Sequence, residues 1–89
     1  MFVTSAWWVY LVRSRSGKLY TGITTDLERR FREHCGEGAR GARFFRGDPA
    51  EAMVYCEPAE NRSLASRREA AIKKLRRSEK ESLIIPPLN

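Results

Sequence analysis

An apolar run of aromatic and β-branched residues, Trp7–Val12, lies near the start of the chain. Such residues favour a pleated and largely buried strand. The turn residues of 13–17 (RSRSG) end the run, and Lys18–Thr24 continues as a second strand. Two strands joined by a short loop of this composition predict a β-hairpin.

The residues after the hairpin have a pattern that predicts a helix. Thr25 or Asp26 can cap a helix that runs to about Cys35-Gly36. At about 3.6 residues per turn, one stripe of this helix carries Leu27, Arg30, Phe31 and His34. Cationic groups inside a core-facing stripe are unusual for a purely structural helix, so Arg30 and His34 are candidate functional residues.

The second half of the chain predicts one more strand and two helices. Ala50–Glu57 is typical of a strand that ends before Pro58. Asn61 or Ser63 can cap a long helix to about Arg77, with a short last helix beginning at Ser78-Glu79. The predicted fold class is α/β, a small three-stranded and mostly antiparallel sheet flanked by helices.

The segment Glu37–Asp48 mixes small residues, basic residues and Phe44-Phe45. Basic and aromatic side chains together can contact a sugar-phosphate backbone and stack on bases. A structural alternative is that the two phenylalanines anchor the segment to the core, and we favour that interpretation for them. The arginines of this segment are the better nucleic-acid candidates, namely Arg40, Arg43 and Arg46.

Charge narrows the choice of partner. The 89 residues predict a single domain spanning 1–89, and 17 Lys and Arg against 11 Asp and Glu give a net charge of +6. A small basic domain attracts polyanions, of which nucleic acid is the commonest. The alternative is that the excess charge only keeps the protein in solution.

The sequence gives no sign of a membrane or export function. The longest apolar run is Trp7–Val12, far below the ~20 residues of a spanning helix. Residues 1–6 contain no basic segment followed by a long apolar core, so we expect no secretory signal. Cys35 and Cys56 form no metal-binding CxxC pair, and one disulfide is possible but not implied. A cytoplasmic location is the simplest expectation.

An ordered set of residues resembles a known family. The set is Trp8-Val9-Tyr10, then Tyr20-Thr21-Gly22, then Arg30 and, in the long helix, Glu69. Together these residues resemble the GIY-YIG nuclease domain, most closely its small stand-alone bacterial members, over about Trp7 to Arg77. The resemblance implies a metal-dependent endonuclease that uses Mg²⁺ or Mn²⁺, with DNA favoured over RNA as the expected partner.

The resemblance also implies roles for individual residues. Glu69 would hold the single divalent metal, although from spacing alone an ion pair with Arg68, Lys73 or an arginine of the sheet is favoured. Arg30 would bind the phosphate, because guanidinium donors match its oxygens in pairs. Tyr10 would position or deprotonate the attacking water, and Tyr20 would bond to the phosphate or the water.

His34 has two possible roles, general base or orienter of Tyr10. We expect nucleic-acid contacts from Lys73 as well as from the arginines of Glu37–Asp48. Since both tyrosine hydroxyls must reach one site, we predict a hairpin loop of three or five residues centred on Arg15, with Tyr10 opposite Tyr20.

Two positions depart from the family pattern. Trp8 replaces the glycine of the first triplet, and Ile23 stands where some repair nucleases carry a lysine. These departures motivate a second hypothesis, a basic nucleic-acid-binding module with the same fold and no catalysis. A third is an adaptor whose protein partner supplies the targeting. The oligomeric state stays open.

Overall fold

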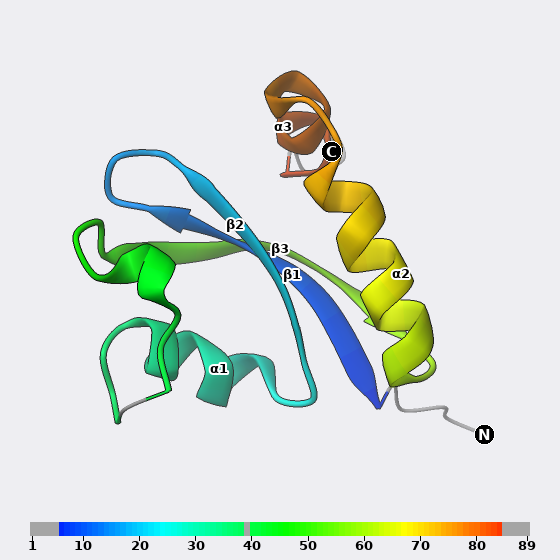
Figure 1. Ribbon diagram of the computed structural model, residues 1–89, viewed down its shortest axis with the longest axis horizontal. Coiled ribbons are helices and arrows are strands. Elements are labelled where there is room, and N and C mark those ends of the chain that lie inside the picture. Colours follow the sequence, from blue (N-terminus) through cyan, green and yellow to red (C-terminus); the bar gives the residue numbers. More distant parts are fainter. Residues whose placement is uncertain (1–5, 39, 85–89) are drawn as a thin grey trace, which may run out of the picture.

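The computed structural model describes residues 6–38 and 40–84, so most of segment 1–6 lies outside it. The described residues form three strands, three α-helices and one short 3-10 helix, η1. Figure 1 shows how the strands and α-helices are arranged. In chain order they are β1 (Trp7–Ser14), β2 (Leu19–Thr24), α1 (Leu27–His34), η1 (Arg43–Phe45), β3 (Ala50–Ala59), α2 (Arg62–Lys73) and α3 (Arg77–Ile84). The predicted α/β class is confirmed.

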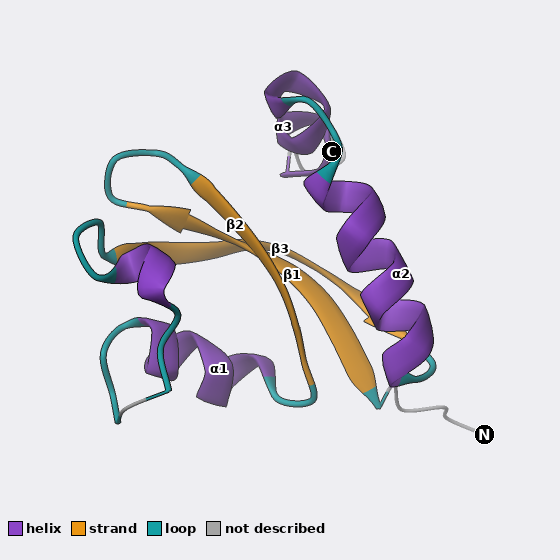
Figure 2. Ribbon diagram, in the orientation of Figure 1, coloured by secondary structure: helices purple, strands orange, loops and turns teal. Residues whose placement is uncertain are grey.

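The sheet has the order β2-β1-β3, and both strand pairs are antiparallel. Residues 9–12 of the central strand β1 are at most 1% exposed, because helices cover both faces (Figure 2). Val9 and Leu11 pack with Ala65 and Ile72 of α2. Tyr10 and the residues packed with it, from α1 and η1, form the second cluster. The Tyr10 side chain and α2 therefore lie on opposite faces of the sheet.

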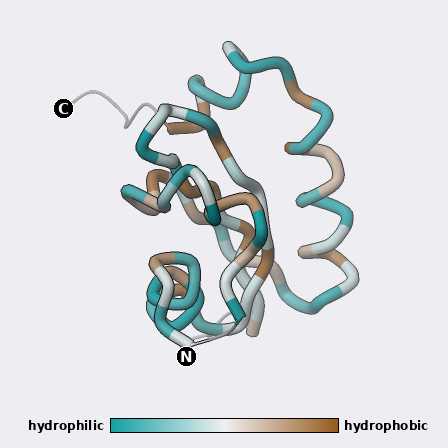
Figure 3. The backbone as a smooth tube through the Cα atoms, turned by 60° about the vertical axis from the view of Figure 1, so that its left-hand side comes forward, coloured by the Kyte–Doolittle hydropathy of each residue, from teal (hydrophilic) through white to brown (hydrophobic). Residues whose placement is uncertain are grey.

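Hydropathy follows this layering. In Figure 3 hydrophobic colour gathers along the strands, whereas α2 is mostly hydrophilic with isolated hydrophobic positions. The buried residues of α2 are Ala65 and Ile72, seven residues apart and hence on one stripe. A helix with so narrow an apolar stripe leaves its other faces free for polar contacts.

The hairpin has the predicted odd loop, but its centre is shifted. Ser14 N donates to Lys18 O at 2.9 Å, which leaves a three-residue loop centred on Ser16 instead of Arg15. Gly17 takes a φ of +96° there, the left-handed conformation that such loops favour. As a result Tyr10 pairs with Gly22 and not with Tyr20. The two tyrosines still share a face, as diagonal neighbours.

Strand β3 extends past its predicted end. It continues through Pro58, which pairs with Trp8, to Ala59. A proline lacks the N–H that a central strand needs, but β3 is an edge strand and bonds to a neighbour on one side only. The prediction that the strand stops before Pro58 is therefore wrong.

The caps of α1 and α2 agree with the sequence. Asp26 accepts from Arg29 N at 3.0 Å, and Asn61 accepts from Leu64 N at 2.9 Å. The prediction that α2 reaches about Arg77 is wrong, because the helix ends at Lys73.

The cap of the last helix, α3, lies two residues earlier than predicted. Glu79 Oε1 accepts from Arg76 N at 2.8 Å, which is the glutamate half of a capping box, so the cap is Arg76 and not Ser78.

Candidate active site

Gly22 lets the Tyr10 side chain cross to the edge of the sheet. Tyr10 and Gly22 are paired on β1 and β2, and a Cβ at Gly22 would lie 2.6 Å from Tyr10 Cζ. Since real side chains never approach so closely, only glycine allows the phenol to lie over β2. β2 is an edge strand, so the Tyr10 ring lies over the edge of the sheet, and its hydroxyl contacts His34 of α1.

His34 fixes the Tyr10 hydroxyl. Tyr10 Oη and His34 Nε2 are 2.7 Å apart, and both side chains are almost fully buried. The backbone N–H of Ala42 donates to His34 Nδ1 at 3.4 Å. Because Nδ1 accepts, the ring proton of a neutral His34 lies on Nε2 and is donated to Tyr10 Oη. The Tyr10 proton is then free to point at another acceptor.

A loop glycine places that backbone donor. A Cβ at Gly41 would lie 2.5 Å from the carbonyl oxygen of Glu33, in the last turn of α1. The close approach brings the next residue, Ala42, to the His34 ring. Sequence reasoning missed this contact. Gly41, one of three glycines in the segment Glu37–Asp48, is the signal that could have indicated it.

Burial controls the protonation of the pair. It lowers the pKa of His34 to about 4, assisted by the positive charge of Arg30. Burial also raises the pKa of Tyr10 to about 12, although the Arg30 guanidinium opposes this. At neutral pH the site therefore holds a neutral imidazole and a protonated phenol. Of the two roles predicted for His34, this geometry favours orientation of Tyr10.

The pH dependence of the free energy of unfolding should reflect the neutral state of His34 in the folded protein. The unfolded chain takes up the proton near pH 6.5 and the folded chain only near pH 4, so the unfolded state binds more protons between these values. We expect the free energy of unfolding to fall as the pH falls through this window, by about 3 kcal/mol at most. Urea unfolding at several pH values measures it. His34→Gln should flatten the slope, and equal slopes in both proteins would contradict the assignment.

Tyr20 completes an aromatic group beside His34. Its ring centroid lies 6.4 Å from that of Tyr10 and 5.1 Å from that of His34. Phe45 is buried against both Tyr20 and His34, whereas Phe44 stays 38% exposed. Phe45 thus anchors the segment to the core, as predicted, but Phe44 does so only at its edge, against Tyr20 and Phe45.

Arg30 lies at the rim of this group. Its side chain is 24% exposed, and Nη1 donates to Glu33 Oε1 at 2.8 Å and to the carbonyl oxygen of Arg40 at 2.6 Å. Its proximity to Tyr10 is seen in its effect on the phenol's pKa. Arg29, by contrast, is half exposed, as its place outside the stripe predicts. Arg30 therefore offers guanidinium donors held by two contacts beside the Tyr10 hydroxyl.

Glu69 lies on α2, the helix that covers the opposite face of the sheet. Its side chain is 23% exposed and lies between the buried positions Ala65 and Ile72. Lys73 Nζ lies 3.4 Å from Glu69 Oε2, so the ion pair predicted from spacing is present. Burial is the main cause of the raised pKa of Tyr10, and the negative charge of Glu69 makes the smallest contribution to it. Glu69 therefore lies at the margin of the α2 face that packs against the sheet.

A divalent metal at Glu69 would have few protein ligands. Within residues 6–38 and 40–84 no three His, Cys, Asp or Glu side chains gather in a way that would hold a metal ion. Mg²⁺ nevertheless keeps several waters and is often bound through one or two carboxylates. A single, partly exposed carboxylate such as that of Glu69 fits that mode of binding.

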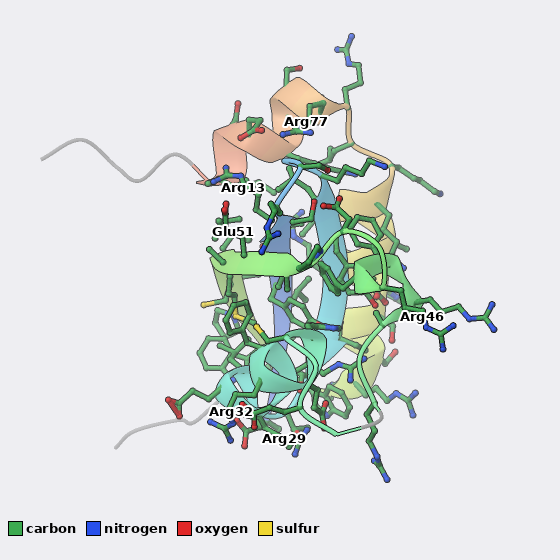
Figure 4. All side chains as sticks on the ribbon, turned by 90° about the vertical axis from the view of Figure 1, so that its left-hand side faces the viewer. Arg13, Arg29, Arg32, Arg46, Glu51 and Arg77 are labelled. Atoms are coloured by element: carbon green, nitrogen blue, oxygen red, sulfur yellow. The ribbon has the colours of Figure 1, made fainter. Side chains whose placement is uncertain are left out.

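The predicted nucleic-acid residues lie in different places. Arg40 acts on Glu33, whose pKa it lowers together with the larger effect of Arg30. Arg43 begins η1, and Arg46 follows its end. Figure 4 shows Arg46 pointing outward from the ribbon, beside a cavity of about 450 Å³ that also touches His34. Lys73 is paired with Glu69. Arg40 thus contacts Arg30 through its carbonyl oxygen, Arg46 shares a cavity with His34, and Lys73 pairs with the candidate metal residue.

No helix in the described ranges is long and apolar enough to cross a membrane.

The GIY-YIG catalytic domain model matches residues 6–82. The chain is 47% identical over 83 residues to UPF0213 protein PA3854 of Pseudomonas aeruginosa, covering 93% of this chain and 78% of the relative. It is 44% identical over 78 residues to UPF0213 protein YhbQ of Escherichia coli K12, covering 88% and 76%.

A solved structure agrees with these relatives. The solution NMR structure of protein EF2693 from E. faecalis superposes with a TM-score of 0.58 at 38% identity, covering 92% of this chain and 85% of that one. The matched range contains both tyrosine triplets, Arg30 and Glu69 in the order that the family resemblance requires. The chain therefore belongs to the GIY-YIG family, among small proteins named UPF0213.

Proposed function

We propose that this chain is a divalent-metal-dependent endonuclease that hydrolyses phosphodiester bonds in DNA. The observation that carries the proposal is the hydroxyl of Tyr10. It is buried and held at 2.7 Å by His34, and the charges of Arg30 and Glu69 act on its pKa in opposite directions. A purely structural tyrosine has no need of a glycine beneath it and charges of both signs around it.

Arg30, Tyr10 and Tyr20 each have a different role in phosphate recognition. Arg30 donates to the non-bridging oxygens, and its contacts with Glu33 and the Arg40 carbonyl hold the guanidinium in place. Tyr10 accepts the proton of His34 Nε2 and directs its own proton at a phosphate oxygen or at the attacking water. Tyr20 lies beside it on the same face of the hairpin and supplies a second hydroxyl.

The phenol does not begin as a base. With a pKa near 12, Tyr10 is protonated at neutral pH, so in the free protein it positions water instead of deprotonating it. Glu69 is the residue that would hold Mg²⁺ or Mn²⁺. The bound ion would supply positive charge for the leaving oxygen and lower the pKa of nearby water.

The substrate is proposed to be DNA with branched, damaged or single-stranded regions, as in repair or recombination. The net charge of +6 supports a polyanionic substrate. The test is conversion of supercoiled plasmid and of branched oligonucleotides to nicked products with Mg²⁺, with EDTA as the control. Products that form with Mg²⁺ and not with EDTA would support the proposal, and their absence from every substrate would contradict it.

A non-catalytic nucleic-acid-binding module is the second candidate. It is favoured by Ile23, which provides no cation next to the tyrosines, and by the high pKa of Tyr10. Salt-sensitive DNA binding without any metal-dependent product would identify this function.

A further inference from the structure

A cavity of about 310 Å³ lies at the end of β2, where β1, α1, the following loop and α2 meet. It is separate from the Tyr10–His34 contact but shares Arg30 with the candidate site. The chain contributes four arginines to its lining, and one acid, Glu33. The arginines are Arg29, Arg30, Arg40 and Arg62.

The charges of this cavity do not balance. Arg30 Nη1 lies 2.8 Å from Glu33 Oε1, and Arg29 Nε lies 4.0 Å from Glu33 Oε2. Both therefore share one carboxylate, which the Arg40 charge also reaches. Four guanidinium groups against one carboxylate leave three positive charges around a small concave space. Such a space attracts a phosphate.

An aromatic ring lies in the same cavity. The guanidinium of Arg62 lies over the Trp7 ring, 5.8 Å from its centroid. Part of the Trp7 ring packs against the core, which is a sufficient reason for an apolar residue there. It does not account for the ring's place in the wall of a cavity lined by arginines. Aromatic and guanidinium planes are the surfaces on which unpaired bases stack.

The cavity is aligned with the candidate metal residue. Arg62 and Glu69 are seven residues apart on α2, hence on one face and separated by about 10 Å. That separation corresponds to about three nucleotide steps at the 3.4 Å rise of a duplex strand. A strand whose cut phosphate lies near Glu69 would therefore bring a nucleotide a few positions away to Arg62 and the cavity.

We propose that this cavity binds an unpaired nucleotide of the DNA strand, a few positions from the phosphate that is cut. Its base stacks on the Trp7–Arg62 pair, and its phosphate is bound by Arg29 and Arg40. The choice of DNA rests on the proposed function. A base in a stacked duplex cannot reach a tryptophan in a cavity, so the protein selects DNA with a single-stranded segment.

The proposal is tested by fluorescence anisotropy of labelled oligonucleotides, with EDTA present so that no cleavage occurs. The probes are a single strand, the duplex of the same sequence, and a single strand with abasic sites. Arg62→Gln is compared with Arg67→Gln, which removes the same charge from an exposed position of α2 outside the cavity.

We expect Arg62→Gln to weaken single-strand binding about tenfold, the lower part of the range for a lost stacking contact, and duplex binding about twofold. Arg67→Gln should weaken both about twofold, as one lost distant charge. The abasic strand should bind the wild type no better than the duplex does. Equal losses in the two variants, or undiminished binding of the abasic strand, would overturn the proposal.

Trp7 is tested by two substitutions, because part of its ring belongs to the core. Trp7→Phe keeps an aromatic plane and should retain the preference for the single strand, whereas Trp7→Leu should lose it with the fold intact by circular dichroism. If Trp7→Leu does not fold, the Arg62 comparison decides. Binding without cleavage would refute the nuclease proposal alone, and cleavage with no effect of Arg62→Gln would refute this one alone.

Discussion

Glu69→Gln is expected to reduce Mg²⁺-dependent DNA cleavage by on the order of 100-fold or more. The substitution keeps the size of a side chain that is 23% exposed, and it removes the negative charge that would hold the metal. DNA binding should stay within about twofold of the wild type, since the change removes a repulsive charge and no donor. The measurements are nicking rates and anisotropy on the same preparations.

The matched control for Glu69 is Glu60→Gln, which neutralises an exposed carboxylate just before α2. It changes the net charge by the same amount, so cleavage should remain at the wild-type rate. If both variants cut as fast as the wild type, Glu69 is not the metal residue. If both lose cleavage equally, the effect comes from net charge.

Gly22→Ala is expected to have a comparably large effect, through packing. The new Cβ would meet Tyr10 Cζ at 2.6 Å, so the buried phenol must move or the strands must separate. Overpacking of this kind costs about 1–3 kcal/mol of folding free energy. Moving the phenol also breaks its 2.7 Å contact with His34, so cleavage should fall even where the variant is fully folded.

Gly47→Ala is the control for that experiment. No atom lies within 4 Å of a Cβ at Gly47, and its φ is outside the left-handed region. Urea unfolding should show a change below about 0.5 kcal/mol for Gly47→Ala, the usual range for a surface substitution. If Gly22→Ala is as stable and as active as Gly47→Ala, the phenol does not cross β2 as described.

Much of the fold follows from local pattern. The β-branched run at Trp7, the turn residues before Lys18 and the caps Asp26 and Asn61 each specify structure through neighbours in sequence. The errors fall where an element's end depends on distant partners. Pro58 is accepted only because β3 has an open edge, and no local signal reveals that.

The candidate site was predictable in its residues and not in its contacts. The family resemblance supplied Tyr10, Tyr20, Arg30, His34 and Glu69, and the structure brings the rings of Tyr10, Tyr20 and His34 together. Which ring nitrogen of His34 carries the proton could not be inferred, because this depends on a backbone N–H eight residues later. The pairing of Trp7 with Arg62 was equally hidden, since it joins β1 to α2 across the whole chain.

The most direct test is to locate the metal, by paramagnetic broadening of backbone amide NMR signals with Mn²⁺. A metal-bearing site shared by the two layers predicts broadening around Glu69 of α2 and around Gly22 of β2, with little at the exposed acids of α3. In Glu69→Gln this broadening should disappear. Broadening that spares both positions, or that survives the substitution unchanged, would contradict the account.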